Sequence, residues 1–314
     1  MFGLFKKSKK EDDIVVLSKP GPAESGGTYA TLDKKAPKEI ISKDIVFFSV
    51  TSRLPYYADE NGDLDNSGGD GPLMYISAFA AQGNDGTFVY LETARRYSLD
   101  GKRKNEWAYV KGDILSELSA LVIVENLAEN NGYNSFTGGL PENFGGKIDI
   151  KYASGESITT SDNHGPVISF NCGTKIVYAF DRAMKGERVK LPEVSSLEKI
   201  CFESCGKDGS FTHASLTILP DGTAVKEIEQ RFDESDFYQS KQEADPEKVA
   251  TIKKIISENG LFAWPSLPVD TYISSEKYIT FFFDDGKTIK IKNERALPHK
   301  ISNGFFKIEL EMTT

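Results

Sequence analysis

The chain has 314 residues, of which 39% are hydrophobic and 27% are charged, the composition of an ordinary globular protein. Its formal net charge of −9 argues against a nucleic-acid partner, which requires clustered Lys and Arg side chains. Three cysteines make no disulfide framework, and no apolar run approaches the roughly 18 residues of a membrane-spanning helix. We therefore expect a cytoplasmic protein without a transmembrane segment.

The N-terminal segment joins an apolar stretch, Met1–Phe5, to a basic stretch, Lys6–Lys10. Basic residues near an anionic lipid surface contribute about 1 kcal/mol each, so this decapeptide could make weak contact with a membrane surface. Asp12 and Asp13 follow at once and offset part of the charge, which favours a solvated tail instead. We predict a flexible leader over residues 1–34.

Three strands are predicted after the leader, because each segment is rich in β-branched and aromatic residues. They cover Ile45–Val50, Leu73–Ala80 and Thr87–Ala94. Asp85-Gly86 joins the last two as a hairpin turn, since Asp-Gly readily takes the positive φ of a type I′ turn.

A helix is predicted next, because the spacing of apolar residues changes from two to about 3.6. These residues run along one helical face from Ile114 to Leu127. Asp113 is a suitable N-cap, and Asn131-Gly132 is a suitable stop signal.

A second hairpin follows the helix, with strands over Lys147–Ala153 and Glu156–Ser161. The next segment, Ile176–Met184, has apolar side chains spaced for a helix. Its counterpart near the end of the chain, Phe305–Met312, has alternating apolar residues that suit a strand. The two segments should agree, and the sequence leaves open which conformation they share.

The second half of the chain repeats the landmarks of the first. The strand Ile45–Val50 recurs 155 residues later as Ile200–Cys205, and the hairpin turn recurs 136 residues later as Asp221-Gly222. The offset changes between landmarks, as insertions confined to loops would cause. The chain is therefore predicted to be a tandem duplication.

The first copy covers residues 35–186 and the second covers residues 187–314. The second copy repeats the three strands as Ile200–Cys205, Thr212–Leu219 and Thr223–Glu229. A helix that begins at Asp245-Pro246 follows, and the last hairpin has strands over Tyr278–Phe283 and Lys287–Lys292. The expected fold class is α+β. Each copy is β-β-β-α-β-β plus a terminal element, with one main helix packed on a mostly antiparallel sheet.

This order of elements resembles a family of uncharacterised bacterial α+β domains of unknown function. The resemblance rests on the Asn-Gly stop, an aromatic residue soon after it (Phe136 or Trp264), the second hairpin and a proline beyond that hairpin. It covers both copies. Because its motifs are turns and core positions, it implies a fold and no activity.

The spacing Cys201-x3-Cys205-x7-His213 offers a first candidate for chemistry. A zinc site needs a second pair of ligands, and the sequence has none nearby. The offset of 155 residues matches Cys201 with Val46 and Cys205 with Val50. We therefore interpret both cysteines as apolar core residues.

Cys172 and His164 form a second candidate, as a nucleophile and its base eight residues apart. Such a pair needs an activated thiolate and an orienting third group. The sequence indicates neither of them.

An acidic segment in the first copy offers a third candidate. Its oxygen-bearing side chains have the spacing of a calcium-binding loop: Asp59, Asn61, Asp63, Asp65 and Asp70. Leu64 stands where such a loop needs Gly, and its last ligand is Asp instead of the usual Glu. An acidic, flexible insertion is the alternative interpretation.

No motif identifies a catalytic residue or a cofactor site, so the sequence assigns no biochemical activity. We favour a non-enzymatic cytoplasmic binding protein whose partner contacts include Tyr56, Tyr57 and Trp264. Two alternatives stay open. One is an enzyme with a site in the first copy only, around the insertion at 53–72, and the other is a peripheral membrane-surface adaptor that uses the basic N-terminal tail.

Overall fold

The computed structural model describes ten stretches of the chain: residues 13–18, 27–54, 73–83, 85–95, 104–140, 144–206, 208–232, 236–264, 275–292 and 299–314. The chain divides into two compact units, Met1–Arg188 and Val189–Thr314. Each unit is a mixed α+β structure with its own, mostly antiparallel sheet.

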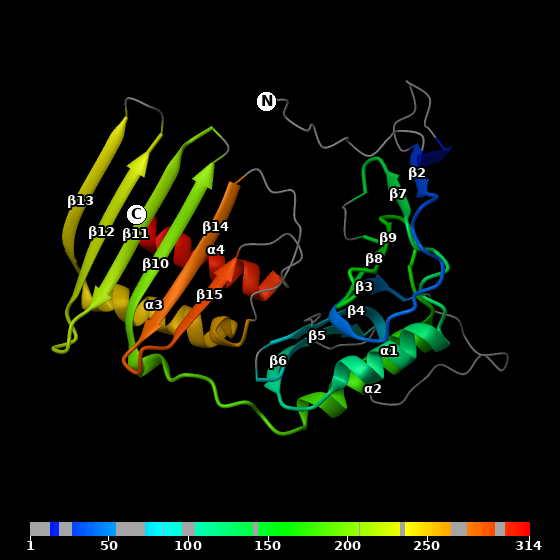
Figure 1. Ribbon diagram of the computed structural model, residues 1–314, viewed down its shortest axis with the longest axis horizontal. Coiled ribbons are helices and arrows are strands. Elements are labelled where there is room, and N and C mark those ends of the chain that lie inside the picture. The colour runs from blue at the N-terminus through cyan, green and yellow to red at the C-terminus, as the bar shows by residue number, and fades with distance from the viewer. Residues whose placement is uncertain are drawn as a thin grey trace, which may run out of the picture. The chain divides into compact units, whose positions relative to one another are not determined.

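The first unit has a nine-stranded sheet and two helices (Figure 1). In spatial order the strands are β1 (Ile14–Ser18), β2 (Thr28–Asp33), β7 (Tyr133–Thr137), β9 (Ser157–Asp162), β8 (Gly146–Tyr152), β3 (Ile45–Arg53), β4 (Leu73–Gln82), β5 (Thr87–Arg95) and β6 (Lys104–Val110). Neighbouring strands are antiparallel except for β7 and β9, which are parallel. The helices are α1 (Ile114–Val124) and α2 (Phe170–Met184).

Both helices of the first unit cover the same face of its sheet, and the main hydrophobic core lies beneath them. Phe48 and Val50 of β3 point into this core, where the Phe48 ring lies 6.3 Å from the ring of Phe180 in α2. Leu118 of α1 is buried in the same cluster. Fully burying a side chain of this size contributes about 1.5–3 kcal/mol, so the helix face supplies much of the unit's stability.

The second unit has a six-stranded sheet and two helices of its own (Figure 1). In spatial order the strands are β13 (Phe237–Ala244), β12 (Ala224–Arg231), β11 (Phe211–Ile218), β10 (Leu197–Gly206), β14 (Ser275–Phe283) and β15 (Thr288–Lys292). The helices are α3 (Pro246–Asn259) and α4 (His299–Thr313). The ring of Phe202 in β10 lies 6.5 Å from that of Phe305 in α4, which marks the helix-covered face.

If β1, β2 and β7 of the first unit are left out, the two units share one order of elements: four strands, a helix, two strands and a helix. In the first unit the shared part of the sheet runs β6-β5-β4-β3-β8-β9, and in the second it runs β13-β12-β11-β10-β14-β15. The central strands also share an irregularity. The ladder from β3 to β8 shifts after Ile45, and the ladder from β10 to β14 shifts after Leu197.

This shared shift in pairing changes the alignment of the central strands. Ile45 pairs with Tyr152, and Leu197 pairs with Phe283. Tyr152 and Phe283 each come directly before the hairpin turn that joins the last two strands of their unit. Ile45 is therefore equivalent to Leu197, an offset of 152 residues instead of 155. Cys201 then matches Ser49, so the sequence alignment of this strand was wrong by three residues.

Cys205 corrects the interpretation of the cysteines further. It matches Arg53 in the new alignment and is exposed, whereas Cys201 is buried. Cys201 pairs with Ser215 and Thr280, and neighbouring Phe202 points to the helices. Because side chains alternate along a strand, Cys201 lies on the face opposite the helices. The prediction of a core position is confirmed for Cys201 and wrong for Cys205.

The predicted capping residues begin α1 and α3 and end α3, but the predicted stop of the first helix at Asn131-Gly132 was wrong. α1 ends earlier, at Val124, just before Asn126 takes a positive φ of 49°. Asp113 accepts a hydrogen bond from the Ser116 backbone N–H at 3.1 Å, as an N-cap does. Asp245 does the same for α3, accepting from Glu247 N–H at 2.8 Å. Gly260 ends α3 in the left-handed conformation, with φ of 64°, which confirms the Asn-Gly stop signal.

The terminal segment of each unit is a helix, so the strand interpretation of Phe305–Met312 was wrong. The buried residues of α4 are spaced four, three and four apart: Ile301, Phe305, Ile308 and Met312. Phe306 and Leu310, which created the alternating pattern, are exposed. Each unit therefore has two helices on its sheet instead of one main helix.

Several strands lie where none was predicted. β1 and β2 form an antiparallel pair inside the segment predicted as a flexible leader, and β2 also pairs with β7. That prediction was wrong for these strands, because β-branched residues there find pairing partners far along the chain. Each unit also has a fourth strand before its first helix, β6 or β13.

Candidate interaction surface

Most of the predicted site residues lie outside the described residues. This holds for Tyr56, Tyr57 and the candidate calcium ligands Asp59, Asn61, Asp63, Asp65 and Asp70. Trp264 is described, and it is buried just after α3, so it presents no exposed ring for the predicted partner contact. Its apolar ring serves the core of the second unit.

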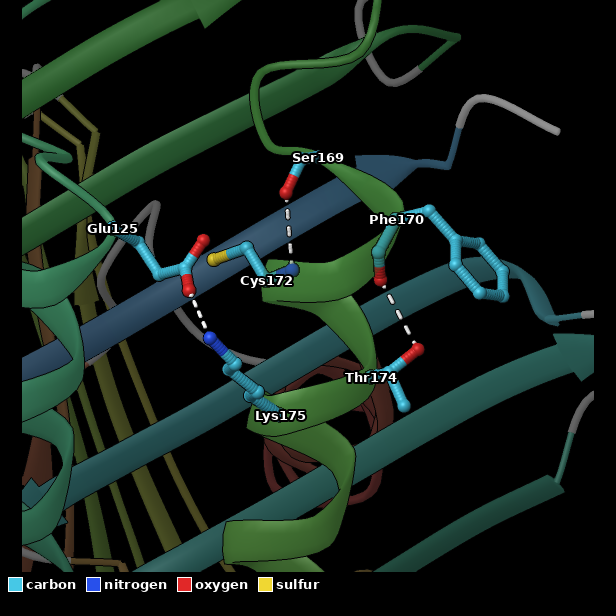
Figure 2. Close-up of polar contacts among 6 residues, drawn as sticks. All are labelled: Glu125, Ser169, Phe170, Cys172, Thr174 and Lys175. Atoms are coloured by element: carbon cyan, nitrogen blue, oxygen red, sulfur yellow. Dashed lines mark hydrogen bonds and ion pairs between the residues drawn. The ribbon is translucent and has the colours of Figure 1, made fainter. Parts of the chain in front are cut away.

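Cys172 lies in the first turn of α2, beneath the N-cap Ser169 (Figure 2). The Cys172 backbone N–H donates to the Ser169 hydroxyl oxygen at 3.0 Å. A helix N-terminus stabilises a thiolate, yet burial raises the pKa of the Cys172 thiol to about 12, and the negative charge of Glu125 adds to that increase. Burial therefore opposes the formation of a thiolate at Cys172.

The surroundings of Cys172 are those of a packed helix end. Figure 2 shows that Glu125 is paired with Lys175 instead, at 2.6 Å, and that the Thr174 hydroxyl donates to the Phe170 carbonyl. The described hydrogen bond of His164 is made by its backbone N–H, to Asp162 at 2.8 Å. Among the described residues, no hydrogen bond joins the Cys172 thiol to His164, so the Cys172–His164 candidate, for which the sequence indicated no activating group, gains no support.

The sheet of the first unit carries a row of aromatic rings on the face away from its helices. Phe47 and Phe79 lie 4.9 Å apart between ring centroids, Phe79 and Phe88 lie 6.1 Å apart, and Phe88 stacks on Trp107 at 6.3 Å. The three Phe rings are buried. These three rings are closed to solvent and Trp107 is half-buried, so the Phe rings do not offer an open stacking platform to a ligand.

The second unit has a polar depression of about 290 Å3 on the face away from its helices. Polar and charged side chains that line it are paired with one another across the strands. Lys241 Nζ lies 2.7 Å from Glu227 Oε1, and Gln239 donates to Glu229 at 3.0 Å. Hydrogen bonding to Lys241 lowers the pKa of Glu227. Exposed pairs of this kind contribute about 0–1 kcal/mol, and they describe a solvated sheet face.

Four apolar side chains are exposed together at the β1 end of the nine-stranded sheet in the first unit. Ile14 and Val16 belong to β1, Tyr29 to β2 and Phe136 to β7, and each is between 39% and 50% exposed. Tyr29 lies directly opposite Phe136, and Val16 lies opposite Thr31, two residues along β2 from Tyr29. Opposed residues of antiparallel strands share a face, so all four lie on one face of the sheet. We call these four residues the β1 patch.

The β1 patch borders an open sheet edge, because β1 is an end strand of the nine-stranded sheet. Within the described ranges, β1 pairs with β2 alone. The strand is five residues long and has a bulge at Leu17, which is exposed. Its free edge can therefore accept only a short strand.

The four end strands differ in charge. Charged residues at an edge hinder pairing with other chains. Three of the end strands carry such residues: Lys104 and Glu106 in β6, Lys241 and Glu243 in β13, and Lys290 and Lys292 in β15. The sequence of β1, Ile14-Val-Val-Leu-Ser18, has none. β1 is thus the edge with the least protection against pairing.

The sequence contains a strand signal for β1, but the composition of the residues after it favoured a flexible leader. Ile14-Val-Val-Leu17 is a β-branched run, but Pro and Gly residues follow it and suggested a leader. Its neighbour β2 pairs in turn with β7, which comes more than 100 residues later in the chain, so no local pattern connects these strands. The four residues of the β1 patch lie together only because β2 pairs with β7.

No protein-family model matches the chain, and a comparison with curated proteins finds no similar sequence. In the part of the chain that the structure describes, no group of His, Cys, Asp and Glu side chains has an arrangement that could hold a metal ion. No helix among the described residues is long and apolar enough to cross a membrane.

Proposed function

We propose that the chain is a non-enzymatic binding protein that contacts a partner protein through the β1 patch. The supporting observation is that four large apolar side chains are gathered on one face beside an uncharged sheet edge. Contiguous exposed apolar surface beside polar surroundings commonly marks an interaction site. Burying the exposed half of each side chain would contribute roughly 1 kcal/mol, so the four side chains together would supply part of the free energy of a contact.

Affinity capture after in-cell crosslinking tests this function with three forms of the full chain. The patch variant carries Val16→Lys and Phe136→Ser, and the matched control carries Phe237→Ser and Tyr238→Ser in β13, whose rings are also exposed. We expect wild type and control to retain the same partner and the patch variant to lose at least nine-tenths of it. Equal capture by all three forms would show that the β1 patch binds nothing.

We also propose that the two units arose by tandem duplication. The shared order of six strands and two helices supports it, together with the matching shift in pairing after Ile45 and Leu197. The resemblance to uncharacterised bacterial α+β domains stays a prediction. A cytoplasmic location is likewise proposed, and it is supported by three cysteines that are all free thiols.

A further inference from the structure

We propose that the edge of β1 binds an extended, uncharged, β-branched segment of a partner protein, which adds to the sheet as a tenth strand. This inference rests on the proposed function and specifies how the partner binds. In strand addition, backbone hydrogen bonds hold the segment, and side chains on alternate positions select it.

The backbone of β1 supplies the first requirement. β1 ends the sheet, and within the described residues its ladder is formed with β2. The N–H and C=O groups on its outer side are therefore a template for one more strand. The bulge at Leu17 limits that template, so the added segment pairs over about five residues.

The side chains of β1 define the chemistry of the segment. An added strand would place alternate side chains next to Ile14 and Val16, on the same face as Tyr29. A charged side chain there would lose hydration and gain no partner from the uncharged strand. β-branched and uncharged residues fit best, because they pack on a pleated, half-exposed surface.

Charge and size disfavour a second copy of the chain as the occupant. Each chain carries a net charge of −9, so two copies repel one another at long range. A stable dimer buries about 1,200–2,000 Å2 in total, far more than a five-residue strand pair provides. A short segment needs no such area, because strand addition gains affinity from the backbone.

The test uses the full chain and a fluorescein-labelled seven-residue peptide of alternating threonine and valine. Its matched control peptide has the same sequence with every amide N-methylated, which removes the backbone donors. We expect saturable binding of the first peptide by fluorescence anisotropy and at least tenfold weaker binding of the second. Hydrogen exchange should show added protection confined to the amides of Ile14–Ser18 and the adjacent strand.

Two protein variants complete the test. Val16→Lys places a charge on the free edge and should weaken peptide binding at least tenfold, whereas Phe237→Lys on the β13 edge should leave it unchanged. Both positions are exposed, and circular dichroism verifies the fold of each variant. Unchanged protection of Ile14–Ser18 on peptide addition would overturn strand addition even if a variant failed to fold.

The other outcomes separate this inference from the proposed function. Equal binding of the N-methylated peptide, or no saturable binding, overturns strand addition while the capture result for the β1 patch still stands. Sedimentation that shows a wild-type dimer made monomeric by Val16→Lys identifies a second copy as the occupant and also overturns the inference. If the patch variant captures as much partner as wild type and the control variant, the proposed function is overturned.

Discussion

Lys226 is the most unusual residue of the second unit, because it is a lysine on the helix-covered face of β12 with 1% of its surface exposed. Its ammonium group donates to the carbonyl oxygen of Glu311 at 3.5 Å, in the last turn of α4. Carbonyls in the last turn of a helix have no partner within the helix, so a cation is favourable there. In the first unit the equivalent position is Val89, which pairs with Ala80 as Lys226 pairs with Leu216.

Burial lowers the pKa of Lys226 to about 8, and the charge of nearby Lys248 adds to the effect. Because the folded pKa lies below that of free lysine, the folded chain loses this proton first, and its stability increases as pH rises from 8 towards 10. We expect Lys226→Met to stabilise the chain by about 1 kcal/mol at pH 7, since an apolar residue replaces a buried charge. That advantage should shrink between pH 8 and 10.

Urea unfolding of both forms across this pH range measures the effect. The matched control is Lys254→Met, since Lys254 is an exposed residue of α3 that pairs only loosely with Glu258, at 3.9 Å. A constant difference between Lys226→Met and wild type from pH 7 to 10 would contradict the lowered pKa.

The three cysteines should differ sharply in reactivity. Burial raises the pKa of both Cys172 and Cys201, while Cys205 is exposed. We expect a thiol reagent at pH 8 to modify one thiol rapidly in the folded chain and three in denaturant, because reaction requires an accessible thiolate. Cys205→Ser should remove the rapid phase, and rapid modification that persists in this variant would show that a buried thiol is accessible.

At the scale of elements, local signals placed α1 and α3 and failed for α4 and for the edge strands. The caps Asp113, Asp245 and Gly260 act on groups within a few residues, so sequence alone locates them. The strands β6 and β13 lie at sheet edges and bury few side chains, so their sequences carry little periodicity. Their pairing partners stabilise them, and that information is not local.

The stop of α3 gives a test at this scale. Gly260 has φ of 64°, which a residue with a Cβ adopts at a cost of about 1 kcal/mol or more. We expect Gly260→Ala to destabilise the chain by about 1–2 kcal/mol in denaturant unfolding. Gly112→Ala is the matched control, since Gly112 has an ordinary φ and open space where its Cβ would lie. Equal effects of the two substitutions would contradict the conformational explanation.

At the scale of the whole molecule, each unit has a complete sheet with two helices and a core of its own. We expect Val189–Thr314, expressed alone, to fold and to unfold in one cooperative thermal transition followed by near-ultraviolet circular dichroism. The aromatic contacts Phe202–Phe305 and Phe262–Phe281 should give it a folded signal. A chain without near-ultraviolet signal would show that the second unit depends on the first.

The sequence by itself determined the α+β class, the starts of α1 and α3 and the repeated order of landmarks, because capping, turn and periodic signals act within a few residues. The tertiary structure alone decided three further features. It corrected the alignment of the central strands through the shift after Ile45, it made both terminal segments helical, and it placed Tyr29 beside Phe136. Each of these depends on pairing or packing between residues far apart in the chain, which a local pattern does not encode.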